Sequence, residues 1–170
     1  LTKSPSLKKQ PTSSLVDLYV QAAVTKPLFD DIVAGIGNDF KAETGRTMTV
    51  SICPTLKKTS RMAEKAQFKA SEPGDVSGVK DIDRAMVVGA TMDDVNVVMT
   101  VLFKLHAAGK LEIVRAKDRY LEAPSGGGWR DIMVNISLTV DGVQHICEIQ
   151  VVHHQMLNAR KEMDGHVVYN

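Results

Sequence analysis

Cysteines, aromatic side chains and long apolar runs are all scarce in this sequence of 170 residues. Its two cysteines, Cys53 and Cys147, are too few for a disulfide framework, so we expect a reducing, cytoplasmic environment. No stretch approaches the roughly 18 apolar residues of a membrane-spanning helix, and no signal peptide is visible at the polar, basic amino end. The formal net charge is only +1, so any charged partner must be recognised by local clusters.

The length of the chain predicts one domain with a single core. Residues 1–13 hold three lysines, two prolines and three serines, and little that could enter a core. We therefore expect a flexible leader over residues 1–13 and one domain over residues 14–170. Because the chain begins with Leu1 and not with methionine, we also expect it to be a piece of a longer protein.

Apolar periodicity and chain-breaking residues predict an alternation of helices and strands. Asp141-Gly142 is typical of a two-residue hairpin turn, so the last two strands should be antiparallel. The pattern indicates an α/β (α+β) fold in which helices flank a mixed five-stranded sheet. Helices are expected at residues 15–24, 27–44, 57–70, 92–108 and 153–163, and strands at 48–52, 81–88, 111–115, 132–140 and 143–152.

Asp81 and Glu148 are the carboxylates best placed for chemistry, because one begins a predicted strand and the other lies in the middle of one. An ionised carboxylate is costly to bury without a partner. Together with Asp83, these acids could bind Mg²⁺, which prefers oxygen ligands and keeps waters that phosphates can replace. The alternative is that all three lie in solvent, with Glu148 on an exposed strand face and the aspartates paired with neighbouring cations.

Two cationic segments accompany these acids. Lys57, Arg61 and Lys65 recur every four residues, which places them on one stripe of the predicted helix. That stripe is either a solvated face or a ridge that binds phosphates. Further along, three glycines at 126–128 precede the only tryptophan, Trp129, and Arg130. Triple glycine is entropically costly in an ordered fold, so a function should require its backbone freedom. An aromatic ring beside such a loop, here Trp129, could stack a nucleobase. The alternative is that Trp129 packs in the core.

Four residues near the carboxyl end could suggest zinc, namely His145, Cys147, His153 and His154. Their spacing matches neither a Cys-x-x-Cys pair nor a His-x-x-x-His pair, which disfavours a zinc site.

Taken in order, these motifs resemble the synthetase domain of the RelA/SpoT family, the alarmone (ppGpp) synthetases, which have a nucleotidyltransferase-like fold. The resemblance covers about residues 55–169. It implies that Lys57 and Lys65 contact the phosphates of the donor, with Arg61 on the same stripe. It also implies that Asp81 binds Mg²⁺ and that Arg84, shortly after it, holds phosphates.

The later motifs of the resemblance concern the acceptor. An aromatic residue after the glycine stacks on the acceptor guanine in the family, which implies this role for Trp129. The Glu-(Val/Ile)-Gln motif matches Glu148-Ile149-Gln150, whose glutamate lies near the acceptor hydroxyl and the metal in the family. The other positions that the resemblance assigns to substrate binding are Lys117, Arg130, Gln150 and His166.

The chain departs from the family at four positions. Thr55 stands near the place of an arginine expected to contact the donor adenine, and Ser125 replaces a lysine of the glycine loop. Asp131 and Met133 replace a serine and a histidine that follow the loop. We expect the added charge of Asp131 to weaken nucleotide binding.

The retained and missing residues leave two possible functions, one enzymatic and one not. The first is an Mg²⁺-dependent enzyme that moves the β,γ-pyrophosphate of ATP to a ribose 3′-hydroxyl of a guanine nucleotide, or to the 3′ end of an RNA. It requires Asp81 and Glu148 to lie close enough to share one ion. The second is a non-catalytic domain that binds nucleotides or a protein partner. The missing donor-site residues favour the second function, and the retained acids favour the first.

Overall fold

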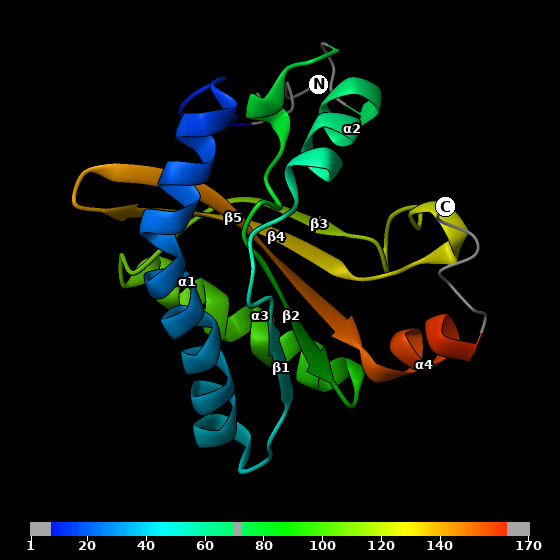
Figure 1. Cartoon of the computed structure of the whole chain (residues 1–170). Helices are drawn as coiled ribbons and strands as arrows, with labels where there is room; N and C mark the ends of the chain where they lie inside the picture. Colours follow the sequence, from blue (N-terminus) through cyan, green and yellow to red (C-terminus); the bar gives the residue numbers. More distant parts are fainter. Residues whose placement is uncertain (1–7, 70–72, 163–170) are drawn as a thin grey trace, which may run out of the picture.

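The computed structural model describes residues 8–69 and 73–162 and has the α/β architecture that the sequence predicts (Figure 1). His166 lies outside the described residues. The helices are α1 (Leu15–Thr44), α2 (Thr59–Lys69), α3 (Met92–Ala107) and α4 (His154–Glu162), with short 3₁₀ turns η1 (Val76–Gly78) and η2 (Gly126–Gly128). The strands are β1 (Thr49–Ile52), β2 (Arg84–Gly89), β3 (Glu112–Asp118), β4 (Ile132–Val140) and β5 (Val143–His153).

The five strands form one mixed sheet in the order β1-β2-β5-β4-β3. β2 runs parallel to β5, and the other neighbouring pairs are antiparallel. The predicted hairpin turn is confirmed, because Asp141 and Gly142 have φ values of 50° and 79°, the positive values of a type I′ turn. β5 therefore lies in the middle of the sheet, with β2 on one side and β4 on the other.

The first helix corrects a prediction, since the two helices expected on either side of Pro27 are one continuous helix. Its buried side chains recur every three or four residues across the proline, from Leu18 to Phe40. Pro27 itself is exposed, and so is Ala23, whose carbonyl loses its helical partner and can bond water instead. Packing of one continuous apolar stripe thus outweighs the local cost of the proline.

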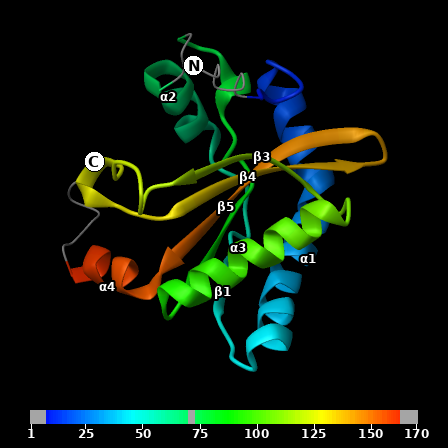
Figure 2. The same cartoon turned by 180° about the vertical axis from the view of Figure 1, so that it is seen from behind.

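α1 and α3 pack on the same face of the sheet and form the main core with it. Figure 2 shows α3 in front of the sheet, where it crosses α1, whereas α2 lies at the top of the view. Among the described helices, none is long and apolar enough to cross a membrane. The buried core side chains include Phe29, Val33, Ile36 and Phe40 of α1, Val95, Val98 and Leu102 of α3, and Val134, Ile136, Ile149 and Val151 of the sheet.

Two predicted boundaries move, and both changes affect the candidate site. The strand expected to begin at Asp81 begins at Arg84, and the helix expected to begin at Lys57 begins at Thr59. Lys57 and Asp81 therefore lie in irregular segments, which are joined by a hydrogen bond of 2.8 Å from the Lys57 backbone N–H to the Ile82 carbonyl. Strand alternation does not apply there, so the two aspartates need not share a face.

Gln10, in the segment expected to be a flexible leader, is buried and joins two parts of the fold. Its side-chain amide donates to the carbonyls of Val79, at 3.0 Å, and Ile146, at 2.8 Å. Its side-chain oxygen accepts from the backbone N–H of Ile146 at 2.9 Å. These bonds hold the segment before β2 against the first half of β5.

His145 is fully buried, and neither ring nitrogen has a hydrogen-bond partner among the described residues. Burial lowers the pKa of His145 to about 4, because a charged imidazole cannot be solvated there. In the unfolded chain the pKa of the same group is near its ordinary value of 6.5. The unfolded state therefore binds the proton first as the pH falls.

We expect His145 to contribute a loss of stability between pH 6.5 and about 4, and none above pH 6.5, where both states are neutral. The shift corresponds to about 3 kcal/mol over that window. Urea unfolding of the wild type and of His145→Leu at several pH values measures the difference. Equal pH slopes for the two proteins would contradict the assignment.

Candidate functional site

The face of the sheet opposite α1 and α3 carries a row of polar side chains. The strand register places Arg84 of β2 beside Glu148 of β5, Glu148 beside Asn135 of β4, and Asn135 beside Arg115 of β3. Residues paired in this way point to the same side of a sheet. We call this side the polar face; α2 and the glycine loop lie at its ends (Figure 1).

Glu148 and Asp81 are both buried on this face, with exposed fractions of 7% and 8%. The alternative that they lie in solvent is therefore wrong. The carbonyl of Asp83 accepts a hydrogen bond of 3.0 Å from the backbone N–H of Glu148, which brings the two segments together. Burial raises the pKa of Glu148, and the nearby Asp81 charge raises it further, against the opposing effect of Lys65.

Two lysines hold the carboxylate of Asp81. Its Oδ2 lies 2.9 Å from the Lys57 ammonium and 2.8 Å from that of Lys65. Burial by itself raises the pKa of Asp81, but Lys65 and Lys57 together outweigh it and hold the pKa below its ordinary value. The other oxygen, Oδ1, is buried and has no hydrogen-bond partner among the described residues. Asp81 is thus an ionised carboxylate with one free oxygen.

The stripe predicted for Lys57, Arg61 and Lys65 is divided in the structure. Lys57 precedes α2, and Tyr19 of α1 fixes it by donating its hydroxyl to the Lys57 carbonyl. Arg61 is exposed and pairs with Glu64 at 2.8 Å, away from Asp81. The structure therefore brings two of the three cations to the acid and leaves Arg61 at the surface.

Asp83 does not join the other two acids. Its carboxylate is fully buried and lies 3.4 Å from the ammonium of Lys26 on α1. Lys26 also pairs with Asp30 at 2.9 Å and donates to the Cys53 carbonyl. Burial raises the pKa of Asp83 to about 6, although Lys26 opposes the rise. Asp83 thus anchors α1 to the start of β2 and supplies no ligand to the polar face.

At the other end of the polar face, the glycine loop presents Trp129. Gly127 and Gly128 have φ values of 71° and 76°, which explains the need for glycine. The ring of Trp129 is half-buried, so it is not a core residue as the alternative held. The guanidinium of Arg160, on α4, lies 5.0 Å from the ring centroid, within cation–π range.

Asp131, whose added charge was expected to weaken nucleotide binding, does not lie exposed beside the loop. It is fully buried, and Arg119 neutralises it at 2.7 Å. Its second oxygen accepts a hydrogen bond of 3.0 Å from the indole nitrogen of Trp129. Asp131 therefore orients the aromatic ring, and its charge is shielded from the surface of the loop.

Three other predicted substrate-binding residues have definite positions. Arg130 donates to the carbonyls of Arg119 and Tyr120, at 2.8 and 3.1 Å, so it closes the loop on itself. Gln150 lies on the polar face and donates to Glu148 at 3.3 Å. Lys117 of β3 pairs with Met133, which places it on the same face.

Asp81 and Glu148 are too few to bind Mg²⁺ by themselves and would need phosphate oxygens and water to complete its coordination. No group of three or more His, Cys, Asp or Glu side chains among residues 8–69 and 73–162 could hold a metal ion. Mg²⁺ in nucleotide sites typically uses one or two carboxylates together with phosphate oxygens and water. The free Oδ1 of Asp81, next to the buried Glu148, meets that smaller requirement. The donor set suits an ion that arrives with phosphates.

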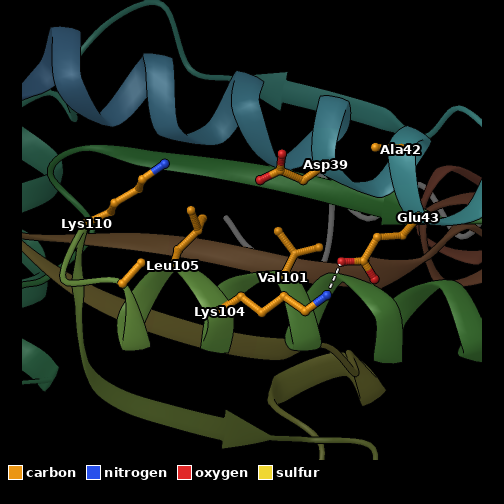
Figure 3. Close-up of a pocket in the computed structure, with 8 residues that line it drawn as sticks. Asp39, Ala42, Glu43, Val101, Lys104, Leu105 and Lys110 are labelled. Carbon is orange, nitrogen blue, oxygen red and sulfur yellow. Dashed lines mark hydrogen bonds and ion pairs between the residues drawn. The ribbon is translucent and has the colours of Figure 1, made fainter.

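The sequence did not single out Lys80, Arg115 or Asn135 as site residues. Asn135 alternates with core residues of β4, so its place opposite Glu148 follows only from the hairpin register. A separate cavity of about 310 Å³ lies between α1 and α3 (Figure 3). It is lined by apolar groups and by an ion pair between Glu43 and Lys104, and no predicted site residue reaches it.

The fold is that of the alarmone synthetases. The structure superposes on a GTP pyrophosphokinase family protein of Streptococcus pneumoniae with a TM-score of 0.67 and 21% identity, over 91% of this chain and 74% of the other. Small alarmone synthetase 1 of Bacillus subtilis, bound to its product pppGpp, gives 0.64 and 19%, over 92% and 80%. Small alarmone synthetase 2 of B. subtilis gives 0.66 and 19%, over 91% and 79%.

No family model and no curated protein matches the sequence. At this identity the likeness establishes the fold, and the resemblance seen in the motifs is confirmed at that level.

We expect Asp131→Ala to lower the free energy of unfolding by about 3 kcal/mol, because Arg119 loses its buried partner. The emission of Trp129, the only tryptophan, should change at the same time. Asp131→Asn keeps an acceptor for the indole and should leave the emission closer to that of the wild type. An Asp131→Ala protein with unchanged stability and emission would contradict this role.

Proposed function

We propose that this chain is an Mg²⁺-dependent transferase that moves the β,γ-pyrophosphate of ATP to the ribose 3′-hydroxyl of a guanine nucleotide. The 3′ end of an RNA is a second acceptor of the same chemistry. The observation that carries the proposal is the pair of buried acids, Asp81 and Glu148, with two lysines on one side. Solved structures of the same fold were obtained with pppGpp and with AMPCPP, which supports nucleotides as the ligands.

In this proposal the acceptor oxygen forms a bond to the β-phosphorus of ATP, the bond from that phosphorus to the α,β-bridging oxygen breaks, and AMP leaves. Magnesium, when bound, neutralises charge on the transferred phosphates. Asp81 would hold the ion through its free Oδ1. Glu148 would accept the proton of the hydroxyl, and its raised pKa makes it a better base than an ordinary carboxylate.

Lys57 and Lys65 would bind the donor phosphates. Both now share the Oδ2 of Asp81, so they are already positioned next to the proposed ion. Ammonium groups bind phosphate as charge-assisted donors. The unpaired Nη1 of Arg84, buried on the same face, is a further donor for a phosphate oxygen. The polar face thus offers cations and the unpaired oxygen of Asp81 on one side of Glu148.

Trp129 would stack the acceptor base, with its ring held in place by Asp131. Arg160 now occupies one approach to the ring, and a base that uses this approach must displace it. The non-catalytic alternative is favoured by the missing donor-site residues, Thr55 and Ser125 among them. A domain that only binds ligands, however, has no chemical need for two carboxylates buried side by side.

Labelled ATP, Mg²⁺ and GDP, GTP or RNA should yield label transfer with the wild type. We expect Glu148→Gln to lower the rate about 10²–10⁴-fold, since it removes the general base. Asp81→Ala should have a loss of similar size. Asp31→Asn, at an exposed position of α1, is the matched control and should not change the rate. Nucleotide binding without transfer in the wild type would favour the non-catalytic function.

The pH dependence of transfer gives a separate test. Glu148 acts as a base only when ionised, and burial raises its pKa above the ordinary value of 4.5. Activity should therefore rise with pH along a limb whose midpoint lies above 4.5, and this limb should be absent from the residual activity of Glu148→Gln. A limb at or below 4.5 would exclude Glu148 as the base.

Trp129→Leu should raise the acceptor KM about tenfold or more, because base stacking on an aromatic ring is lost. The KM for ATP should change little, and Trp129→Phe should retain most of the acceptor affinity. Parallel titrations of both substrates measure the difference. A Trp129→Leu protein with equal rises in both constants would show a general disturbance of the loop.

A further inference from the structure

Lys80 is a buried cation without an anionic partner. Its exposed fraction is 8%, and no described carboxylate lies within 4.0 Å of its ammonium. Its hydrogen bond to the Gly78 carbonyl is long, at 3.4 Å. A charged ammonium in such a place loses its hydration without compensation. This residue is part of neither the predicted site nor the motifs of the resemblance.

The charges around Lys80 are mostly positive. Burial lowers the pKa of Lys80, and Arg115, Lys65 and Lys9 lower it further. Asp75 is the nearby acid that opposes them, and it is already bonded to Lys9 at 2.7 Å. Lys9 and Lys65 are paired with Asp75 and Asp81, so Lys80 and Arg115 are the two cations of this group without a carboxylate partner among the described residues, and a bound anion would supply one.

Asn135 provides an independent observation. Its exposed fraction is 1%, and neither atom of its side-chain amide has a partner among the described residues. Arg115 lies next to it in the strand register, and the guanidinium of Arg115 makes no hydrogen bond or ion pair with a described residue. A native protein rarely buries an amide in this way, and a missing ligand is one explanation.

We propose that Lys80, Arg115 and Asn135 form a subsite that binds a phosphate group of the donor polyphosphate. The amide nitrogen of Asn135 and the two cations supply donors, and the acids Asp81 and Glu148 adjoin them. Trp129 precedes β4, whereas Asn135 and Arg115 lie further toward the β4–β5 turn. Asn135 thus lies further from Trp129 along the polar face than the Met133–Gln150 pair does.

The identity of the donor rests on the proposed function, whereas binding of a polyphosphate at this subsite does not. The enclosure of Lys80 and Asn135 suits a small terminal phosphate better than the backbone of a folded RNA. Inorganic tripolyphosphate is therefore the appropriate probe. It carries the charge pattern of the donor and lacks the base and the sugar.

The subsite has a consequence for stability that a purely structural lysine would not have. Without ligand, the charge of Lys80 opposes folding because it is buried among other cations. Lys80→Met keeps the length of the side chain and removes that charge. We expect this variant to unfold at equal or higher urea concentration than the wild type, and to bind tripolyphosphate at least tenfold more weakly.

The experiment uses the 170-residue chain at fixed salt, with calorimetric titration of tripolyphosphate and urea unfolding in parallel. Asn135→Leu should also weaken binding, by severalfold. Lys110→Met, which removes an exposed lysine after α3, is the matched control and should bind as the wild type does. Tripolyphosphate should raise the unfolding midpoint of the wild type and of the control.

Unchanged binding in Lys80→Met, or wild-type binding of a single-stranded RNA but not of tripolyphosphate, would overturn the subsite. Loss of stability in Lys80→Met would identify a structural role for the lysine instead. Failure of the proposed function is distinguishable: the wild type would then bind tripolyphosphate in a Lys80-dependent way without transferring label. Conversely, label transfer with an ATP KM unaffected by Lys80→Met would reject the subsite alone.

Discussion

The parallel pairing of β2 with β5 is the constraint on which the candidate site depends. This pairing places Arg84 beside Glu148 and continues one residue further, where the Asp83 carbonyl binds the Glu148 amide. The chain just before β2 is therefore held against the middle of the sheet. Because of this backbone arrangement, Asp81 lies close enough to Glu148 for its charge to raise the pKa of Glu148, although 67 positions (148 − 81) separate them in the sequence.

Burial on both faces of β5 then determines the electrostatics. The side toward α1 and α3 is filled by Cys147, Ile149 and Val151. The opposite side is polar yet also shielded, so charges there interact strongly. Asp81 responds by pairing with two lysines, whereas Glu148 has a raised pKa. Two carboxylates in one environment thus acquire different proton affinities, which is the arrangement that acid–base chemistry and metal binding require.

Much of the fold could be predicted from local patterns. The Asp141-Gly142 turn, the alternation of β4 and the Thr91 cap of α3, which forms a capping box with Asp94, are all encoded within a few residues. Pro27 misled the prediction because its cost is local and the apolar stripe that outweighs it is tertiary.

The partners of the site residues could not be predicted in the same way. The charge of Asp131 is neutralised by Arg119, which lies 12 positions away across a loop of irregular shape. Asp83 turned toward Lys26 because the segment before β2 is not a strand. Asn135 is a further example. The sequence shows a polar residue in the middle of β4, but it does not show that the side-chain amide lacks a hydrogen-bond partner.

The departures from the family pattern acquire a physical meaning on this sheet. The resemblance expects a histidine at position 133, where this chain has Met133, paired with Gln150. Asn135 lies two residues later on the same face and pairs with Glu148. The polar side chain of β4 is therefore closer to the β4–β5 turn than the expected histidine would be. Lys80 and Arg115 lie at that end as well. Ser125, which replaces the loop lysine, lies in the glycine loop with Trp129, whereas Lys80, Arg115 and Asn135 lie away from Trp129, toward the β4–β5 turn. A chain that had merely lost its site would have no reason to bury new unpaired donors there, because each one opposes folding until an anion binds it.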